Sequence, residues 1–207
     1  MEGSRGLGDV YKRQVSKLLR KDATGLPWLG TFHSISAKLL RKHADAVGLK
    51  SNFTIIDQDD QVRLIKNICK AENVDIKKIS PKFILAIIDK WKNKGFYPQD
   101  VILKRKDPLE KNFLSIYKIY QEKLVNLNSA DFSDLILHTL KIFEKYADIA
   151  ELYSKKFKYI LVDEYQDTNF IQSEWLKHLS GYNKNICCVG DDDQSIYSWR
   201  GAEIKNF

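Results

Sequence analysis

Two short apolar runs, each followed by acidic residues, constrain the fold of this chain more than any other feature of its sequence. The runs are KYILV at 158–162 and NICCVG at 185–190, and a segment with helical spacing around 171–179 separates them. Short continuous apolar runs of this kind are typical of buried parallel strands. Strand, helix and strand in this order predict a parallel α/β sheet with right-handed crossovers.

The residues that follow the two runs point to one ligand site. Asp163 and Glu164 come directly after the first run, and Gly190 and Asp191 follow the apolar part of the second. Ligands bind at the carboxyl ends of the strands in such sheets. We therefore expect the two acidic clusters to lie at the same edge of the sheet and to serve one site.

The central part of the chain, 57–126, has helical spacing throughout. Apolar residues recur at i, i+3, i+4 and i+7 around 84–91, and a similar stripe continues over 113–124. Asp57 is placed to cap the first helix of this block, and Pro98 follows the second. This pattern predicts a helical subdomain.

The flanking segments complete the expected order of elements. WLGTF at 28–32 predicts a short strand that leads into a helix ending near Val47, and the apolar stripe over 131–143 predicts another helix. Residues 1–14 lack such periodicity, and GDVYKRQ within them resembles translated adaptor sequence. We therefore treat 1–14 as non-native and leave it out of the fold prediction.

Composition narrows the class of protein without selecting a function. Residues 1–126 carry 25 basic and 14 acidic side chains, whereas 127–207 carry 9 and 13. A basic excess favours polyanions such as nucleic acid, but lysine-rich helices are also ordinary solvated faces. The apolar runs fall far short of the roughly 18 to 20 residues of a membrane span, and the three cysteines lack C-x-x-C spacing. We expect a soluble, intracellular protein with reduced, buried cysteines.

Four blocks of the sequence resemble motifs of superfamily 1 DNA helicases of the UvrD/Rep type. KYILVDEYQDTN at 158–169 resembles their Walker B segment, and VGDDDQSIYSWRGA at 189–202 resembles their motif III. GTFHS at 30–34 resembles an early DNA-contact motif, and DFSDLI at 131–136 resembles a further short motif. The blocks occur in family order, and the resemblance they carry extends over nearly everything after residue 15. DEYQDTN followed by GDDDQSIYSWRG makes it highly specific.

This resemblance implies a fold, a function and partners. The expected fold class is α/β, a partial RecA-like P-loop NTPase domain with a parallel sheet. Residues 15–56 and 127–207 would form the motor domain, and 57–126 a helical insertion subdomain. The implied function is an ATP-dependent DNA helicase or translocase that moves on single-stranded DNA in repair or replication. ATP and Mg²⁺ are the implied cofactors. Single-stranded DNA, DNA junctions and DNA-repair proteins in the bacterial cytosol are the implied partners.

The acidic residues suit phosphoryl transfer. That reaction needs Mg²⁺ to bridge phosphate oxygens and a side chain to orient or deprotonate the attacking water. We assign Asp163 to the magnesium shell and Glu164 to the water as general base. Taken in isolation, Asp163 could instead cap the next helix, with Glu164 a solvated neighbour. The resemblance implies that the Gln194 amide senses the terminal phosphate, and a simple loop hydrogen bond is the alternative.

The aromatic and arginine cluster of Tyr197, Trp199 and Arg200 suits unpaired bases. Aromatic faces stack on bases of any sequence for roughly 1 to 3 kcal/mol each, and arginine adds a flat cation. Thr31 and His33 contact the phosphate backbone by resemblance. Core packing is the alternative for Trp199 and for His33.

Two departures from the family pattern limit what these residues can do. The phosphate-binding loop G-x-x-x-x-G-K-[ST] needs a Gly-Lys pair, and the sequence contains none; the sequence also ends at Phe207, before any second motor domain. We expect the polypeptide alone to hydrolyse ATP negligibly. Two other interpretations are a non-catalytic single-stranded nucleic-acid-binding module and a part of a helicase-nuclease. A scaffold protein would leave the two acidic blocks unexplained.

Overall fold

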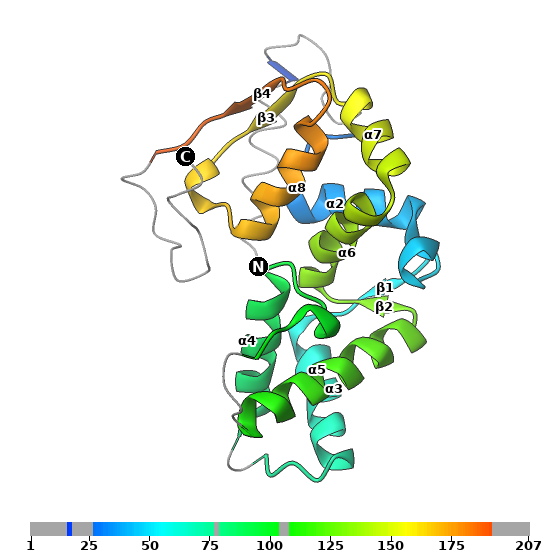
Figure 1. Ribbon diagram of the computed structural model, residues 1–207, viewed down its shortest axis with the longest axis vertical. Coiled ribbons are helices and arrows are strands. Elements are labelled where there is room, and N and C mark those ends of the chain that lie inside the picture. The colour runs from blue at the N-terminus through cyan, green and yellow to red at the C-terminus, as the bar shows by residue number, and fades with distance from the viewer. Residues whose placement is uncertain (1–15, 18–26, 77–78, 104–107, 192–207) are drawn as a thin grey trace.

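The chain folds into two packed groups of elements, which Figure 1 shows one above the other. This computed structural model describes residues 16–17, 27–76, 79–103 and 108–191. The lower group, the helical lobe, contains α3 (Gln58–Ala71), α4 (Pro81–Lys92), η3 (Pro98–Asp100) and α5 (Pro108–Asn126). The upper group, the sheet lobe, contains α2 (Phe32–Lys42), η2 (Ala44–Val47), α6 (Phe132–Lys145), α7 (Ala147–Lys156), β3 (Ile160–Val162), η4 (Tyr165–Asp167), α8 (Phe170–Ser180) and β4 (Ile186–Cys188).

The helices of the helical lobe begin at capping side chains. Asp57 accepts a hydrogen bond from the Asp60 N–H ahead of α3, and Ser80 accepts one from Phe83 ahead of α4, which has Pro81 in its first turn. The predicted apolar stripes form the core of this lobe, which includes Ile65, Ile68, Ile84, Ile88, Ile116, Tyr117, Tyr120 and Leu124. Within the described ranges, no helix is both long enough and apolar enough to cross a bilayer.

The sheet lobe is built around α6 and α8. Capping boxes start both helices, Asp131 with Asp134 at α6 and Asn169 with Gln172 at α8. Their apolar faces pack with α7 and β3 in a core that includes Leu137, Leu140, Phe143, Val162, Trp175 and Leu176.

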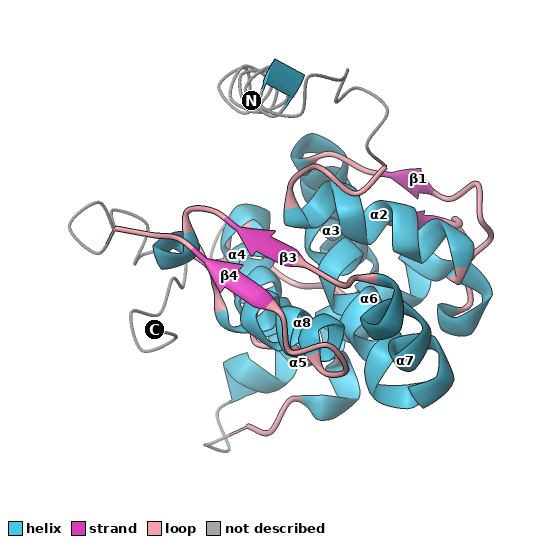
Figure 2. Cartoon of the chain, turned by 90° about the horizontal axis from the view of Figure 1, so that it is seen from above, coloured by secondary structure: helices cyan, strands magenta, loops and turns pink. Residues whose placement is uncertain are grey.

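The predicted parallel pairing of the two apolar runs is confirmed. β3 pairs with β4 in parallel, with Ile160 opposite Ile186 and Val162 opposite Cys188. Figure 2 shows the two strands side by side in front of the helices. The carboxyl ends of both strands therefore lie at the same edge, as expected.

The prediction that these strands are buried is wrong for β4 and holds for only one face of β3. Val162 is 8% exposed, but its neighbour Leu161 is 83% exposed, and every residue of β4 is exposed. Successive side chains of β3 point to opposite faces, and among the described residues the helices cover one of them only. β4 is covered on neither face within the described part of the chain, so Cys187 and Cys188 are both exposed, whereas Cys69 is buried as predicted.

The strand predicted at 28–32 is not formed. Instead, α2 begins at Phe32, because the Thr31 side chain accepts a hydrogen bond from the Ser34 N–H at 3.2 Å and caps the helix. The helix ends at Lys42, and the short 3₁₀ helix η2 completes the segment predicted to be helical to Val47.

A second, unpredicted pair of strands lies where the two lobes meet. β1 (Thr54–Ile55) pairs in parallel with β2 (Ser129–Ala130). The whole helical lobe lies between these two strands in sequence, so the pairing brings its entry and its exit together (Figure 1).

Candidate functional site

The turn after β3 carries the two predicted carboxylates. Asp163 and Glu164 are both exposed, and the Glu164 N–H donates a hydrogen bond to Asp163 Oδ1 at 3.0 Å. Glu164 has φ 52° and ψ 42°, in the left-handed region. A non-glycine residue held there costs on the order of 1 kcal/mol, and such strain clusters at functional sites.

Backbone hydrogen bonds join this turn to the end of β4. Val189 N–H donates to the Val162 carbonyl at 2.8 Å, and Tyr165 N–H donates to the Val189 carbonyl at 3.0 Å. The two acidic clusters are therefore neighbours, as the sequence predicted.

Gln166 extends this connection through its side chain. The residue is 2% exposed. Its Nε2 donates to Glu164 Oε2 at 2.7 Å, and its Oε1 accepts from the Asp191 N–H at 3.1 Å. Sequence analysis did not select Gln166, because a glutamine in an acidic turn carries no signal of burial.

Asp167 adds a third carboxylate to this turn. Its Oδ1 is buried and has no hydrogen-bond partner among the described residues. Burial, and then the charge of Glu164, raise the pKa of Asp167. The turn therefore concentrates negative charge, which is a favourable environment for a cation.

The donor set fits a magnesium ion delivered with a nucleotide better than a dedicated metal cage. No group of three or more metal-ligating side chains occurs in the part of the chain that the structure describes. Mg²⁺ keeps several waters and is often held by one or two carboxylates together with substrate phosphates. Asp163 is exposed and uses Oδ1 for one backbone hydrogen bond, so a carboxylate oxygen is left for the ion.

The structure places Thr31 and His33 at the start of α2, on a different element from the carboxylates. Thr31 is exposed and serves as the helix cap. The His33 ring lies edge-on to Phe132, with ring centroids 6.0 Å apart, and burial lowers the pKa of His33. His33 is thus half-buried, and the predicted DNA contacts of both residues stay predictions. Gln194, Tyr197, Trp199 and Arg200 lie outside the described residues.

Two aspartates of the DFSDLI block, Asp131 and Asp134, bind a buried lysine that the sequence did not point to. Lys92 of α4 is fully buried, and its Nζ lies 2.6 Å from Asp131 Oδ2 and 2.7 Å from Asp134 Oδ1. Tyr120 and Gln121 of α5 donate to the same two carboxylates. Burial lowers the pKa of Lys92, but the two carboxylates outweigh burial and raise it. Lys92 is therefore charged, and we call these five residues the interlobe clasp.

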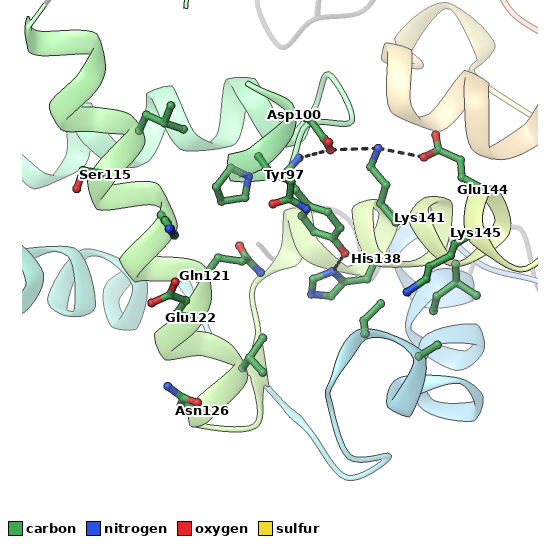
Figure 3. Close-up of a pocket in the computed structure, with 18 of the residues that line it drawn as sticks. Tyr97, Asp100, Ser115, Gln121, Glu122, Asn126, His138, Lys141, Glu144 and Lys145 are labelled. Carbon is green, nitrogen blue, oxygen red and sulfur yellow. Dashed lines mark hydrogen bonds and ion pairs between the residues drawn. The ribbon is translucent and has the colours of Figure 1, made fainter. Parts of the chain in front are cut away.

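A groove of about 1220 Å³ lies between α5, η3 and α6, away from the carboxylate turn (Figure 3). The Tyr97 hydroxyl is hydrogen-bonded to His138 Nδ1 in its wall. Lys141 forms ion pairs with Asp100 at 3.3 Å and with Glu144 at 3.0 Å. None of the predicted site residues that the structure describes lines this groove.

Known proteins similar to this chain are helicases. The family model of the UvrD/REP helicase N-terminal domain matches residues 9–207. DNA helicase II of Rickettsia typhi is 46% identical over 182 residues, which cover 86% of this chain and 28% of that protein. ATP-dependent DNA helicase PcrA of Staphylococcus epidermidis is 43% identical over 195 residues, which cover 94% of this chain and 27% of that protein. The chain thus spans just over a quarter of the length of these relatives. Because the family model covers almost all of it, the chain belongs to the UvrD/REP helicase family.

Proposed function

We propose that this chain is part of the first motor domain of an ATP-dependent DNA helicase, which couples ATP hydrolysis to movement on single-stranded DNA in the bacterial cytosol. In this proposal, 15–56 and 127–207 belong to a partial RecA-like domain, and 57–126 is a helical insertion. Family membership and the printed names of the relatives support it. The parallel pairing of β3 with β4 is consistent with such a domain.

The observation that carries the proposal is the carboxylate turn at the end of β3. Asp163 and Glu164 are exposed at the edge of a parallel sheet where ligands bind, and Glu164 is held in a strained conformation. A turn of this kind is hard to explain as a helix cap, because Asn169 caps α8 and Asp163 does not.

Within this site, each residue has a proposed role. Asp163 binds the magnesium ion that accompanies ATP. Glu164 takes the proton from the attacking water, and Gln194 senses the terminal phosphate. When bound there, magnesium would supply positive charge to offset the charge that develops on the phosphate oxygens.

The proposed DNA contacts extend this site. Tyr197 and Trp199 stack on unpaired bases, and Arg200 adds a cation to them. Thr31 and His33 contact the phosphate backbone near the start of α2. DNA junctions and DNA-repair proteins are the proposed partners of the intact protein.

The test is Glu164→Gln in the intact protein that contains this chain. A general base contributes about 100- to 10,000-fold, so DNA-stimulated ATP turnover should fall by about 100-fold or more while ATP binding is retained. Glu151→Gln, on the exposed surface of α7, is the matched control and should keep normal turnover. Unchanged turnover in Glu164→Gln would contradict the assignment of the base.

The chain of 207 residues by itself should hydrolyse ATP negligibly, because it contains no Gly-Lys pair to cradle the phosphates. The measurement is phosphate release by the purified chain with and without single-stranded DNA. Turnover that survives purification and disappears in Glu164→Gln would show that this part of the proposal is wrong.

A further inference from the structure

We propose that Gln166 is a positioning residue of this site, which holds the Glu164 carboxylate and the backbone at Asp191 in one arrangement. The inference rests on the proposed function, in which Glu164 acts on the attacking water. It adds to that function a residue that touches neither ATP nor water and acts through Glu164.

The geometry of the Gln166 amide carries the inference. The side chain is buried between the ends of β3 and β4, with Nε2 2.7 Å from Glu164 Oε2 and Oε1 3.1 Å from the Asp191 nitrogen. An ionised carboxylate only accepts hydrogen bonds, and a backbone N–H only donates them. The two partners therefore determine the amide orientation, since a flipped amide would lose both bonds.

Few side chains could replace glutamine in this role. Glutamate of the same length has no donor for Glu164, and methionine has neither a strong donor nor a strong acceptor. Asparagine has both groups but is one methylene shorter, so it cannot span the same two partners. The position thus requires a donor and an acceptor at the end of a chain of this length.

The hydrogen bonds of Gln166 continue the pairing of the two strands. Backbone hydrogen bonds join Val189 to Val162 and to Tyr165 at the strand ends. Next to them the side chain of Gln166 joins Glu164 to Asp191. In this way one amide couples the proposed base to the backbone that follows β4.

This coupling matters because an exposed carboxylate is free to rotate. Glu164 is exposed, and its backbone alone does not determine where its carboxylate lies. A misplacement of about 1 Å in a reacting group can cost about 100-fold in rate. The bond from Gln166 Nε2 removes that freedom on one side of the carboxylate and leaves Oε1 of Glu164 for the water.

The experiment compares Gln166→Met and Gln166→Glu in the intact protein. Gln166→Met loses both hydrogen bonds. It should lower kcat for ATP by about 10- to 100-fold, which corresponds to the loss of a hydrogen bond to a charged group, with KM within about 3-fold of normal. Gln166→Glu keeps an acceptor for the Asp191 N–H but places a second carboxylate against Glu164, so its kcat should fall at least as far.

A mutant cycle separates positioning from general damage to the fold. In a Glu164→Gln background, Gln166→Met should leave the residual single-turnover rate unchanged, because the group through which Gln166 acts is gone. The control is Gln172→Met. Gln172 Oε1 accepts a hydrogen bond from the Asn169 N–H at 3.0 Å, away from Glu164, so the kcat of this variant should stay within about 2-fold of normal.

Each outcome decides the inference. Equal losses from Gln166→Met in both backgrounds, or normal kcat in Gln166→Met, would overturn the positioning role while the base assignment stands. Normal turnover in Glu164→Gln alone would overturn the proposed function, and the role of Gln166 with it.

Discussion

At the scale of a single residue, the contact between α4 and α6 shifts the pKa of Asp89. Asp89 of α4 accepts a hydrogen bond from the Ser133 hydroxyl at 3.1 Å. Burial, and then repulsion by Asp131, raise the pKa of Asp89 to about 6, although Lys92 opposes the shift. The fold therefore disfavours the charged form of Asp89.

Asp89 should make stability depend on pH in a defined direction. Its ordinary pKa is 3.8, so between about pH 4 and pH 6 the folded state binds more protons than the unfolded state. The contribution of Asp89 to the free energy of unfolding then falls as pH rises through this window. Asp89→Asn cannot titrate, so its stability relative to the unmodified protein should rise by on the order of 1 kcal/mol from pH 4 to pH 7.

Urea denaturation at several pH values measures this difference. Asp45→Asn, which removes one exposed negative charge, is the matched control. A difference between Asp89→Asn and the unmodified protein that does not change between pH 4 and pH 7 would refute the shifted pKa.

At the scale of an element, β3 has one packed and one open face. Leu161 is 83% exposed and the adjacent Val162 is 8% exposed, although both belong to one apolar run. Alternation along the strand separates them, and the packing of α6 and α8 decides which of the two is buried. The apolar character of a residue in β3 therefore does not predict how much that residue contributes to the free energy of unfolding.

Replacing each of these two neighbours with threonine should change the free energy of unfolding by different amounts. Leu161→Thr keeps a residue with high strand propensity and loses little packing, so the free energy of unfolding should change by less than about 0.5 kcal/mol. Val162→Thr places a hydroxyl in the core and should cost about 1 to 3 kcal/mol. Chemical denaturation of both variants measures the contrast, and equal costs would mean that the second face of β3 is also packed.

At the scale of the whole molecule, the interlobe clasp joins the helical lobe to the sheet lobe. Lys92, Tyr120 and Gln121 come from the helical lobe, whereas Asp131 and Asp134 start the first helix of the sheet lobe. A buried ion pair adds little stability when compared with an apolar replacement, but removing one partner leaves a buried charge unpaired. The relative position of the lobes therefore depends on all members being present.

Removing the lysine should be costly because two carboxylates lose their partner. Lys92→Met preserves side-chain length and should lower the free energy of unfolding by about 3 to 5 kcal/mol. Adding Asp134→Asn removes one stranded charge and should recover part of this loss. Lys90→Met, on the exposed side of the same helix, should stay within about 0.5 kcal/mol. Thermal and urea unfolding measure all three variants, and a small loss in Lys92→Met would show that the clasp is open to water.

The sequence by itself determined most of the helices, the parallel strands β3 and β4 and the place of Asp163 and Glu164, but it did not predict α7, β1 or β2. These follow from local periodicity, from capping residues such as Asp57 and from the rule that ligands bind at strand ends. The family resemblance, which the comparisons confirm, also rested on contiguous blocks of residues.

The tertiary structure alone decided which side chains meet. Lys92 and its carboxylates are 39 and 42 residues apart, and Gln166 reaches Asp191 across the sheet, so no local pattern reveals either contact. The open face of the strands likewise depends on which helices pack against them, since one apolar run contains both the buried Val162 and the exposed Leu161. Sequence periodicity shows which side chains share one face of a helix or strand. Which residues that face contacts, and how deeply it is buried, depend on the elements that the fold packs against it.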